Sequence, residues 1–104
     1  MLFRSGVDPL VGEEAEEKLQ QLDDDWEIVD DHHLKRHFDF EDYKEAENFV
    51  TKVGEIAEEE GHHPNIEFTY GEATIKLYTH KIDGLYDNDF IMAAKIDEMH
   101  EQEF

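Results

Sequence analysis

The stretch Tyr43–His80, YKEAENFVTKVGEIAEEEGHHPNIEFTYGEATIKLYTH, changes its hydrophobic period once, and that change decides the fold. In its first part apolar residues recur at spacings of three and four, which predicts an amphipathic helix from about Glu41 to Glu60. The apolar face of this helix consists of Tyr43, Ala46, Phe49, Val50, Val53, Ile56 and Ala57. Gly61 stands where a glycine commonly ends a helix. After His62-His63-Pro64 the period becomes two, which is typical of half-buried strands.

Two alternating runs on either side of Gly71 predict a β-hairpin. Their apolar and aromatic members are Ile66, Phe68 and Tyr70 in the first run and Ala73, Ile75 and Leu77 in the second. Gly71-Glu72 suits a two-residue type II′ turn, which would pair Phe68 with Ile75. Extended beyond Pro64, this register would place His63 opposite His80 at the open end of the hairpin.

The residues that precede the long helix predict a short helix followed by two strands. The helix is indicated by the spacing of Leu10, Val11, Ala15, Leu19 and Leu22. Trp26–Val29 and Leu34–Phe40 are rich in strand formers, and the Asp30-Asp31 turn between them predicts an antiparallel pair.

A last helix is predicted near the C-terminus, capped by Asp87 or Asn88. Its inner face would carry Phe90, Ala93, Ile96 and Met99. The predicted order is therefore αββαββα. The simplest arrangement is an α+β fold in which helices pack on one face of a four-stranded antiparallel sheet.

The chain length and charge limit the domain organisation and the partners. We expect residues 10–104 to form a single domain after a flexible N-terminus at residues 1–9, because 104 residues support one modest core. The 29 Asp and Glu residues against 9 Lys and Arg give a formal net charge of −20. Such a surface repels nucleic acids and anionic membranes, so we expect neither as a partner.

Three explanations of the acidic surface compete. They are adaptation to a high-salt cytoplasm, a site for basic partners, and mimicry of nucleic acid. The acidic residues are dispersed over helices and loops, which favours the solvated, salt-adapted surface.

The chain has no cysteine, which excludes disulfides, thiolate catalysis and zinc sites built on cysteine. No apolar run is long enough for a signal peptide or a membrane span, so we predict a cytoplasmic protein.

The histidines that flank the hairpin are the candidate catalytic groups. His62, His63 and His80 would converge, and imidazoles with a pKa near about 6.5 can donate and accept protons near neutral pH. Glu58 lies one helical turn before His62 and could orient a ring. Surface histidines and a metal site are the alternatives. We interpret His32, His33 and His37 as a surface cluster, because adjacent residues on a strand point to opposite faces.

The complete pattern resembles the signature of the pterin-4a-carbinolamine dehydratase family. Its elements are Glu58, His62-His63-Pro64, Tyr70, Thr79-His80, Gly84-Leu85 and Asp89, preceded by Phe38-Asp39-Phe40, and the resemblance extends from about Leu10 to Met99. Asp25 before Trp26 and the segment Lys81-Ile82-Asp83 depart from the usual pattern of the family.

The resemblance implies an activity and a site. The reaction would remove water from a 4a-hydroxytetrahydropterin, without a metal or other cofactor, to give a quinonoid dihydropterin. His62, His63 and His80 match the catalytic histidines, while Glu58, Pro64, Thr79 and Asp89 would bind or surround the pterin. It also implies a homodimer or homotetramer. The alternatives are a non-enzymatic pterin-binding or assembly module on the same fold, and a metal-binding protein.

Overall fold

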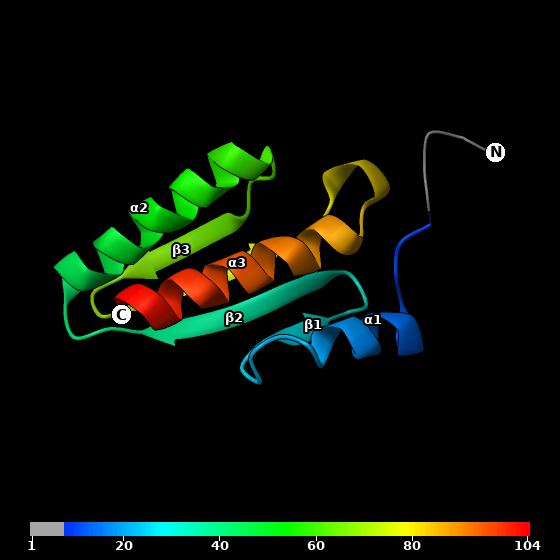
Figure 1. The fold of residues 1–104 in the computed structure, drawn as a ribbon, viewed down its shortest axis with the longest axis horizontal. Helices are drawn as coiled ribbons and strands as arrows, with labels where there is room; N and C mark the ends of the chain where they lie inside the picture. The colour runs from blue at the N-terminus through cyan, green and yellow to red at the C-terminus, as the bar shows by residue number, and fades with distance from the viewer. Residues whose placement is uncertain (1–7) are drawn as a thin grey trace.

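The computed structural model describes residues 8–104 and confirms the αββαββα order, with one additional 3₁₀ turn (Figure 1). Most of the predicted flexible segment 1–9, namely residues 1–7, lies outside the described residues. The elements are α1 (Gly12–Leu19), β1 (Glu27–Val29), β2 (His33–Asp39), α2 (Tyr43–Glu60), β3 (Asn65–Thr69), β4 (Glu72–Leu77), η1 (His80–Ile82) and α3 (Asp87–Glu103).

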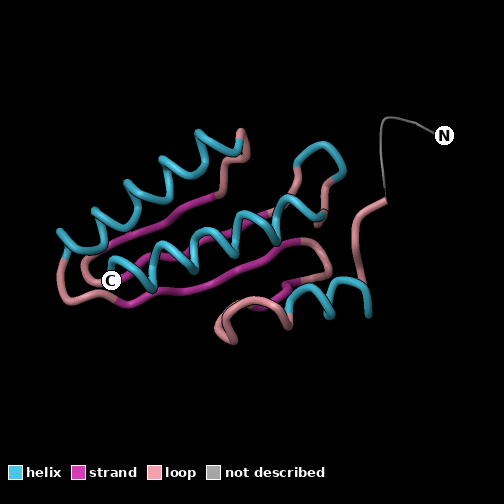
Figure 2. Tube along the Cα trace, viewed as in Figure 1, coloured by secondary structure: helices cyan, strands magenta, loops and turns pink. Residues whose placement is uncertain are grey.

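The four strands form one antiparallel sheet in the order β1-β2-β4-β3. The central pair, β2 and β4, brings Leu34 opposite Leu77 and Asp39 opposite Glu72. Helices α2 and α3 run side by side across one face of the sheet, and α1 lies at the edge of the sheet that β1 forms (Figures 1 and 2). The structure thus confirms the α+β class and the covered face.

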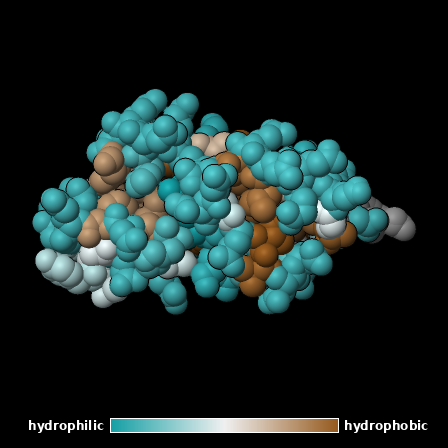
Figure 3. Space-filling model, turned by 90° about the horizontal axis from the view of Figure 1, so that it is seen from below, coloured by the Kyte–Doolittle hydropathy of each residue, from teal (hydrophilic) through white to brown (hydrophobic). Residues whose placement is uncertain are grey.

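Strand β2 shows why one face of the sheet is covered. Leu34, Arg36 and Phe38 are buried, whereas Lys35 and the other alternate residues His37 and Asp39 are exposed. The period of two therefore separates a helix-facing side from a solvent-facing side. The largest fully buried apolar side chains of the core are Phe49, Leu34, Ile75, Leu77, Leu85, Met92, Ile96 and Val53. Hydrophilic side chains dominate the face drawn in Figure 3, with smaller hydrophobic areas near the middle and towards the left of that view.

The predicted hairpin register was wrong by two residues. The turn consists of Tyr70-Gly71, and Phe68 pairs with Ala73 instead of Ile75. Gly71 has φ +76°, so the glycine takes the left-handed conformation at the second central position of the turn instead of the first. A shift of two keeps every side chain on its predicted face. It does remove the basis for placing His63 opposite His80.

The ends of the two long helices are well defined. Asp42 caps α2 by accepting a hydrogen bond from the Glu45 amide at 2.9 Å, and Gly61 ends it at φ +65°. Helix α3 begins one residue earlier than predicted, with Tyr86 at the N-cap position in place of Asp87 or Asn88. The Asp89 carboxylate accepts a hydrogen bond from the Tyr86 amide at 3.0 Å, so the carboxylate of the third helical residue serves the N-cap backbone.

Candidate functional site

The buried carboxylate of Asp89 holds His62. The Asp89 side chain is fully buried, and its Oδ1 lies 2.5 Å from His62 Nε2. Its Oδ2 accepts hydrogen bonds from Thr79 Oγ1 at 2.8 Å and from the Tyr86 amide. A buried carboxylate needs such partners, and here they come from three segments of the chain. The contact requires a proton on His62 Nε2, so Nδ1 of a neutral ring is left as the acceptor.

The left-handed conformation of Gly61 turns the chain sharply after α2 and so starts the histidine loop. The His62 amide donates to the Ala57 carbonyl oxygen at 3.1 Å, which ties the loop to the last turn of α2. His63 then points to Glu58 on that same turn, with 2.6 Å between Nε2 and Oε2. Both of these side chains are exposed. Each of the two adjacent histidines is therefore paired with its own carboxylate, one buried and one at the surface.

His80 stands at the other side of the hairpin, at the start of η1. Its exposed ring stacks on Tyr78 with 4.3 Å between ring centroids and 28° between planes. The preceding Thr79 connects this segment to the site, because its hydroxyl donates to the same carboxylate that holds His62. Thr79 and Gly84 form an isolated bridge that closes the intervening turn.

The structure thus joins some of the predicted site residues and leaves others apart. His62, Asp89 and Thr79 form one hydrogen-bonded group, while His63 pairs with Glu58. Pro64 is half-buried immediately before β3. The side-chain partner of His80 is Tyr78, which the sequence reasoning did not single out. An aromatic residue that directly precedes Thr79-His80 is the signal that could have indicated it.

The prediction that His32 and His33 form a surface cluster with His37 was wrong for His33. His33 is buried, and its Nδ1 lies 3.0 Å from Nδ1 of His32. The alternation rule does not separate the two residues because His32 belongs to the turn before β2, where Asp30 and Asp31 have positive φ. Burial lowers the pKa of His33, as do the nearby positive charges of Lys76 and Lys35, and this favours the neutral ring. His37 is exposed, as predicted.

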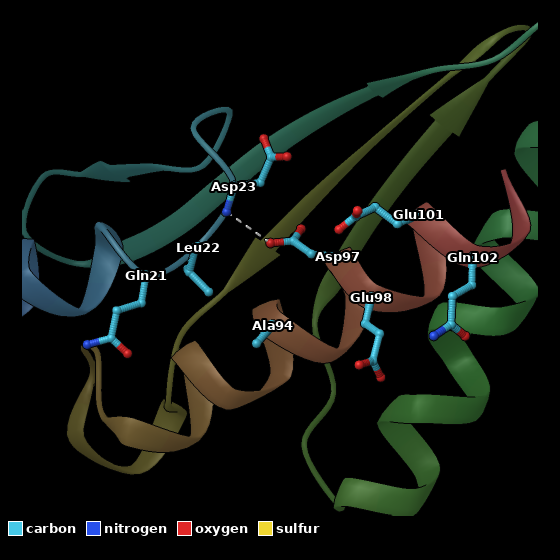
Figure 4. A pocket seen from close by; sticks show the side chains of 8 residues that line it. All are labelled: Gln21, Leu22, Asp23, Ala94, Asp97, Glu98, Glu101 and Gln102. Atoms are coloured by element: carbon cyan, nitrogen blue, oxygen red, sulfur yellow. Dashed lines mark hydrogen bonds between the residues drawn. The ribbon is translucent and has the colours of Figure 1, made fainter.

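A hollow between α3 and the segment that follows α1 lies apart from these histidines (Figure 4). Its lining residues are Gln21, Leu22, Asp23, Ala94, Asp97, Glu98, Glu101 and Gln102. Asp97 accepts hydrogen bonds from the Asp23 amide at 3.2 Å, from Trp26 Nε1 at 2.7 Å and from Arg36 Nη1 at 2.7 Å. The Asp97 carboxylate therefore has a structural role, and we assign this hollow no part in the reaction.

The described residues 8–104 contain no group of three or more His, Cys, Asp or Glu side chains arranged to hold a metal ion. Within the same range, no helix combines the length and the apolar character that crossing a membrane requires.

The hydrogen bond from Thr79 to Asp89 gives a testable stability effect. Thr79→Val keeps the shape of the side chain but removes the donor to a buried carboxylate, so we expect a loss of about 1.5–3 kcal/mol in the free energy of unfolding. Thr79→Ser should retain most of the stability. Urea unfolding measures the effect, and Thr51→Val is the matched control because the exposed Thr51 hydroxyl donates to a backbone oxygen, that of Glu47, and not to a buried carboxylate. Equal losses for Thr79→Val and Thr51→Val would contradict this role.

Comparisons with known proteins agree on one family. The family model described as Pterin 4 alpha carbinolamine dehydratase matches residues 8–99. A protein of Rubrobacter xylanophilus is 53% identical over 96 residues, covering 92% of this chain and 89% of its own. One from Methylococcus capsulatus is 50% identical over 97 residues, covering 92% and 84%. Both bear the name "Putative pterin-4-alpha-carbinolamine dehydratase".

Solved structures agree with this result. A transcriptional coactivator/pterin dehydratase from Brucella melitensis superposes with a TM-score of 0.81 at 31% identity, covering 88% of this chain and 98% of its own. A pterin dehydratase-like protein described as a RuBisCO assembly factor in the alpha-carboxysome gives a TM-score of 0.61 at 25% identity, covering 71% and 87%. The family match, the relatives and the shared fold together establish that the chain belongs to the pterin-4a-carbinolamine dehydratase family.

Proposed function

We propose that this protein converts 4a-hydroxytetrahydropterin to quinonoid dihydropterin and water by histidine general acid–base catalysis, at a site formed by His62, His63 and His80. The observation that carries the proposal is that the two adjacent histidines are each held by a carboxylate, beside the segment Thr79-His80. A hydrogen-bonded carboxylate fixes the orientation and tautomer of an imidazole, which proton transfer requires. The names of the close relatives support the same activity.

The proposed reaction balances without a metal or an external reductant. The lone pair of N5 forms a double bond to C4a as the C4a–O bond breaks. A protonated histidine, either His63 or His80, gives its proton to the departing hydroxyl, which leaves as water. A second, neutral histidine then accepts the proton of N5. Return of a proton from the second histidine to the first, through solvent, restores the enzyme.

The remaining predicted site residues have supporting roles in this proposal. Asp89 orients His62, which in turn orients the pterin, and Glu58 orients the His63 ring. Thr79 holds Asp89 in place, while Pro64 shapes the loop.

The experiment that tests the function is dehydration of synthetic 4a-hydroxytetrahydropterin by the full chain, followed by absorbance against the uncatalysed rate. We expect clear acceleration at molar salt and neutral pH. If folded protein gives no acceleration, the dehydratase assignment is wrong and the second candidate, a non-enzymatic assembly module, takes its place. The observation that favours that candidate is the solved relative described as a RuBisCO assembly factor.

We further propose that the protein is cytoplasmic and forms a homodimer or homotetramer. The molar mass measured by light scattering at molar salt would identify the oligomeric state.

The acidic surface leads to a stability prediction. A net charge of −20 on 104 residues implies strong self-repulsion, which counterions screen. We therefore expect the free energy of unfolding to rise markedly between low and molar potassium chloride. Equal stability in urea titrations at the two salt concentrations would eliminate adaptation to high salt as the explanation of the charge.

A further inference from the structure

Tyr78 contacts the rings of two histidines from different parts of the sequence. Its ring centroid lies 4.3 Å from that of His80 and 4.4 Å from that of His32, with interplanar angles of 28° and 43°. Tyr78 therefore links the ring at the start of η1 to a ring from the turn between β1 and β2. Aromatic contacts of this kind restrict how a side chain can rotate.

His32 is in turn fixed to the turn that carries His80. His32 Nε2 lies 2.8 Å from Oδ1 of Asp83, the residue directly after η1. Asp83 adopts a left-handed conformation at φ +51°, and its amide donates to the His80 carbonyl oxygen at 3.2 Å. The contacts thus form a closed chain from His80 through Tyr78, His32 and Asp83 back to the backbone of His80.

The other side of His32 is also fixed. Its amide donates to the Val29 carbonyl oxygen at 2.9 Å, and its Nδ1 faces Nδ1 of the buried His33 at 3.0 Å. A hydrogen bond between the two facing Nδ1 atoms needs a proton on one of them. Both ring nitrogens of His32 therefore have a partner, and the ring is held from two sides.

Together these contacts give Asp83, at the end of the turn that begins with η1, a structural role. Thr79 and Gly84 close the turn with hydrogen bonds of 2.7 Å and 3.3 Å between their backbones. The turn therefore holds its ends together and presents Asp83 to His32. An exposed imidazole such as His80 would otherwise sample several rotamers, at a cost to any reaction that needs one orientation.

We infer that His32, Tyr78 and Asp83 are positioning residues that hold the His80 imidazole for proton transfer. This inference rests on the proposed dehydratase function and adds residues that act on the substrate only through His80. It predicts that breaking the chain of contacts lowers the turnover number more than it changes substrate affinity.

The test compares Tyr78→Ala and Asp83→Gly with wild type in the dehydration assay. Glycine is chosen at position 83 because it adopts the left-handed conformation without strain. We expect kcat to fall about tenfold in each variant, with KM changed less than twofold. Tyr78→Phe and Asp83→Asn should recover most of the loss, since they restore the ring contact and the acceptor oxygen. Asp39→Gly is the matched control, because Asp39 is as exposed as Asp83 and pairs with His37 at 3.1 Å.

A second comparison separates positioning from a general structural effect. In a His80→Ala background, Tyr78→Ala should cause no further fall in kcat, since the ring that it positions is gone. An equal tenfold fall in both backgrounds would overturn the inference, as would a Tyr78→Ala enzyme with wild-type kcat.

A nuclear magnetic resonance measurement keeps the inference testable apart from activity. The ring current of Tyr78 should shift the His80 Cε1–H signal, and Asp83→Gly should move that signal towards its position in Tyr78→Ala. If Asp83→Gly leaves it unchanged, the chain of contacts does not position His80, whatever the activity. A wild-type protein that shows the signal shifts but no dehydration would refute the proposed function and, with it, the catalytic purpose of the positioning.

Discussion

Replacing either of two histidines, in His63→Ala or His80→Ala, is expected to lower the turnover number for 4a-hydroxytetrahydropterin by about 100-fold or more. Each replacement removes a group that the proposed reaction uses to move a proton. His63 stands opposite Glu58 at 2.6 Å, and His80 is exposed and stacked on Tyr78. The assay is dehydration by absorbance at several pH values, with folding checked by circular dichroism.

The pH profile adds a second criterion. Because the reaction needs one protonated and one neutral histidine, wild-type kcat should depend on pH as a bell, and each single variant should lose one limb. His37→Ala is the matched control, since His37 is an exposed histidine paired with a carboxylate on the solvent-facing side of β2. Turnover within threefold of wild type in both His63→Ala and His80→Ala would exclude them as the acid and base.

The second large effect concerns stability. Asp97→Ala should reduce the free energy of unfolding by about 3–5 kcal/mol, because it leaves a buried charge without its closest partner. Arg36 is 7% exposed, and its remaining carboxylates, on Asp23 and Asp25, are 3.7 Å away. Trp26 Nε1 loses its acceptor as well. Urea unfolding at constant salt measures the change.

The acidic surface supplies a strict control for this prediction. Removing any carboxylate from a chain of net charge −20 should by itself relieve repulsion, so a loss of stability has to exceed that gain. Glu98→Ala removes the same charge from the next, exposed position and should change stability by less than about 0.5 kcal/mol. In an Arg36→Met background, Asp97→Ala should cost much less, since no buried charge is left unpaired. A loss below about 1 kcal/mol for Asp97→Ala alone would contradict the buried-pair role.

The hydrophobic periods were enough to predict the elements and the covered face. Phe49 and Val53 are four residues apart, a spacing that places both on the buried face of a helix. Leu34 and Phe38 belong to an alternation of period two, which places them on the buried face of a strand. The register was harder to predict because Gly71 can supply positive φ at either central position of a two-residue turn. Both choices keep the same residues inside, so hydrophobicity does not distinguish them.

The sequence predicted candidate groups for the site, and one of their contacts in part. The spacing of Glu58 from the histidines indicated that it could orient a ring, and it pairs with His63. The hydrogen bond that holds His62 comes from Asp89 by tertiary contact. The pairing of His32 with Asp83 joins two turns that follow no period, so no pattern in the sequence indicates it. Segments of this kind meet only because β2 and β4 are neighbours in the sheet.

The position of α3 has a consequence for the order in which the protein is made. Asp89, which joins His62 to Thr79, and Asp97, which neutralises Arg36, both lie on this last helix. A ribosome therefore releases His62 and the buried Arg36 well before it releases Asp89 and Asp97, their closest carboxylates. Until α3 docks, Arg36 of the nascent chain lacks its closest carboxylate and His62 lacks the partner that holds it. Chains that terminate early should consequently be unstable as well as inactive, so that synthesis of an incomplete protein leads to its removal by proteases instead of to a defective enzyme.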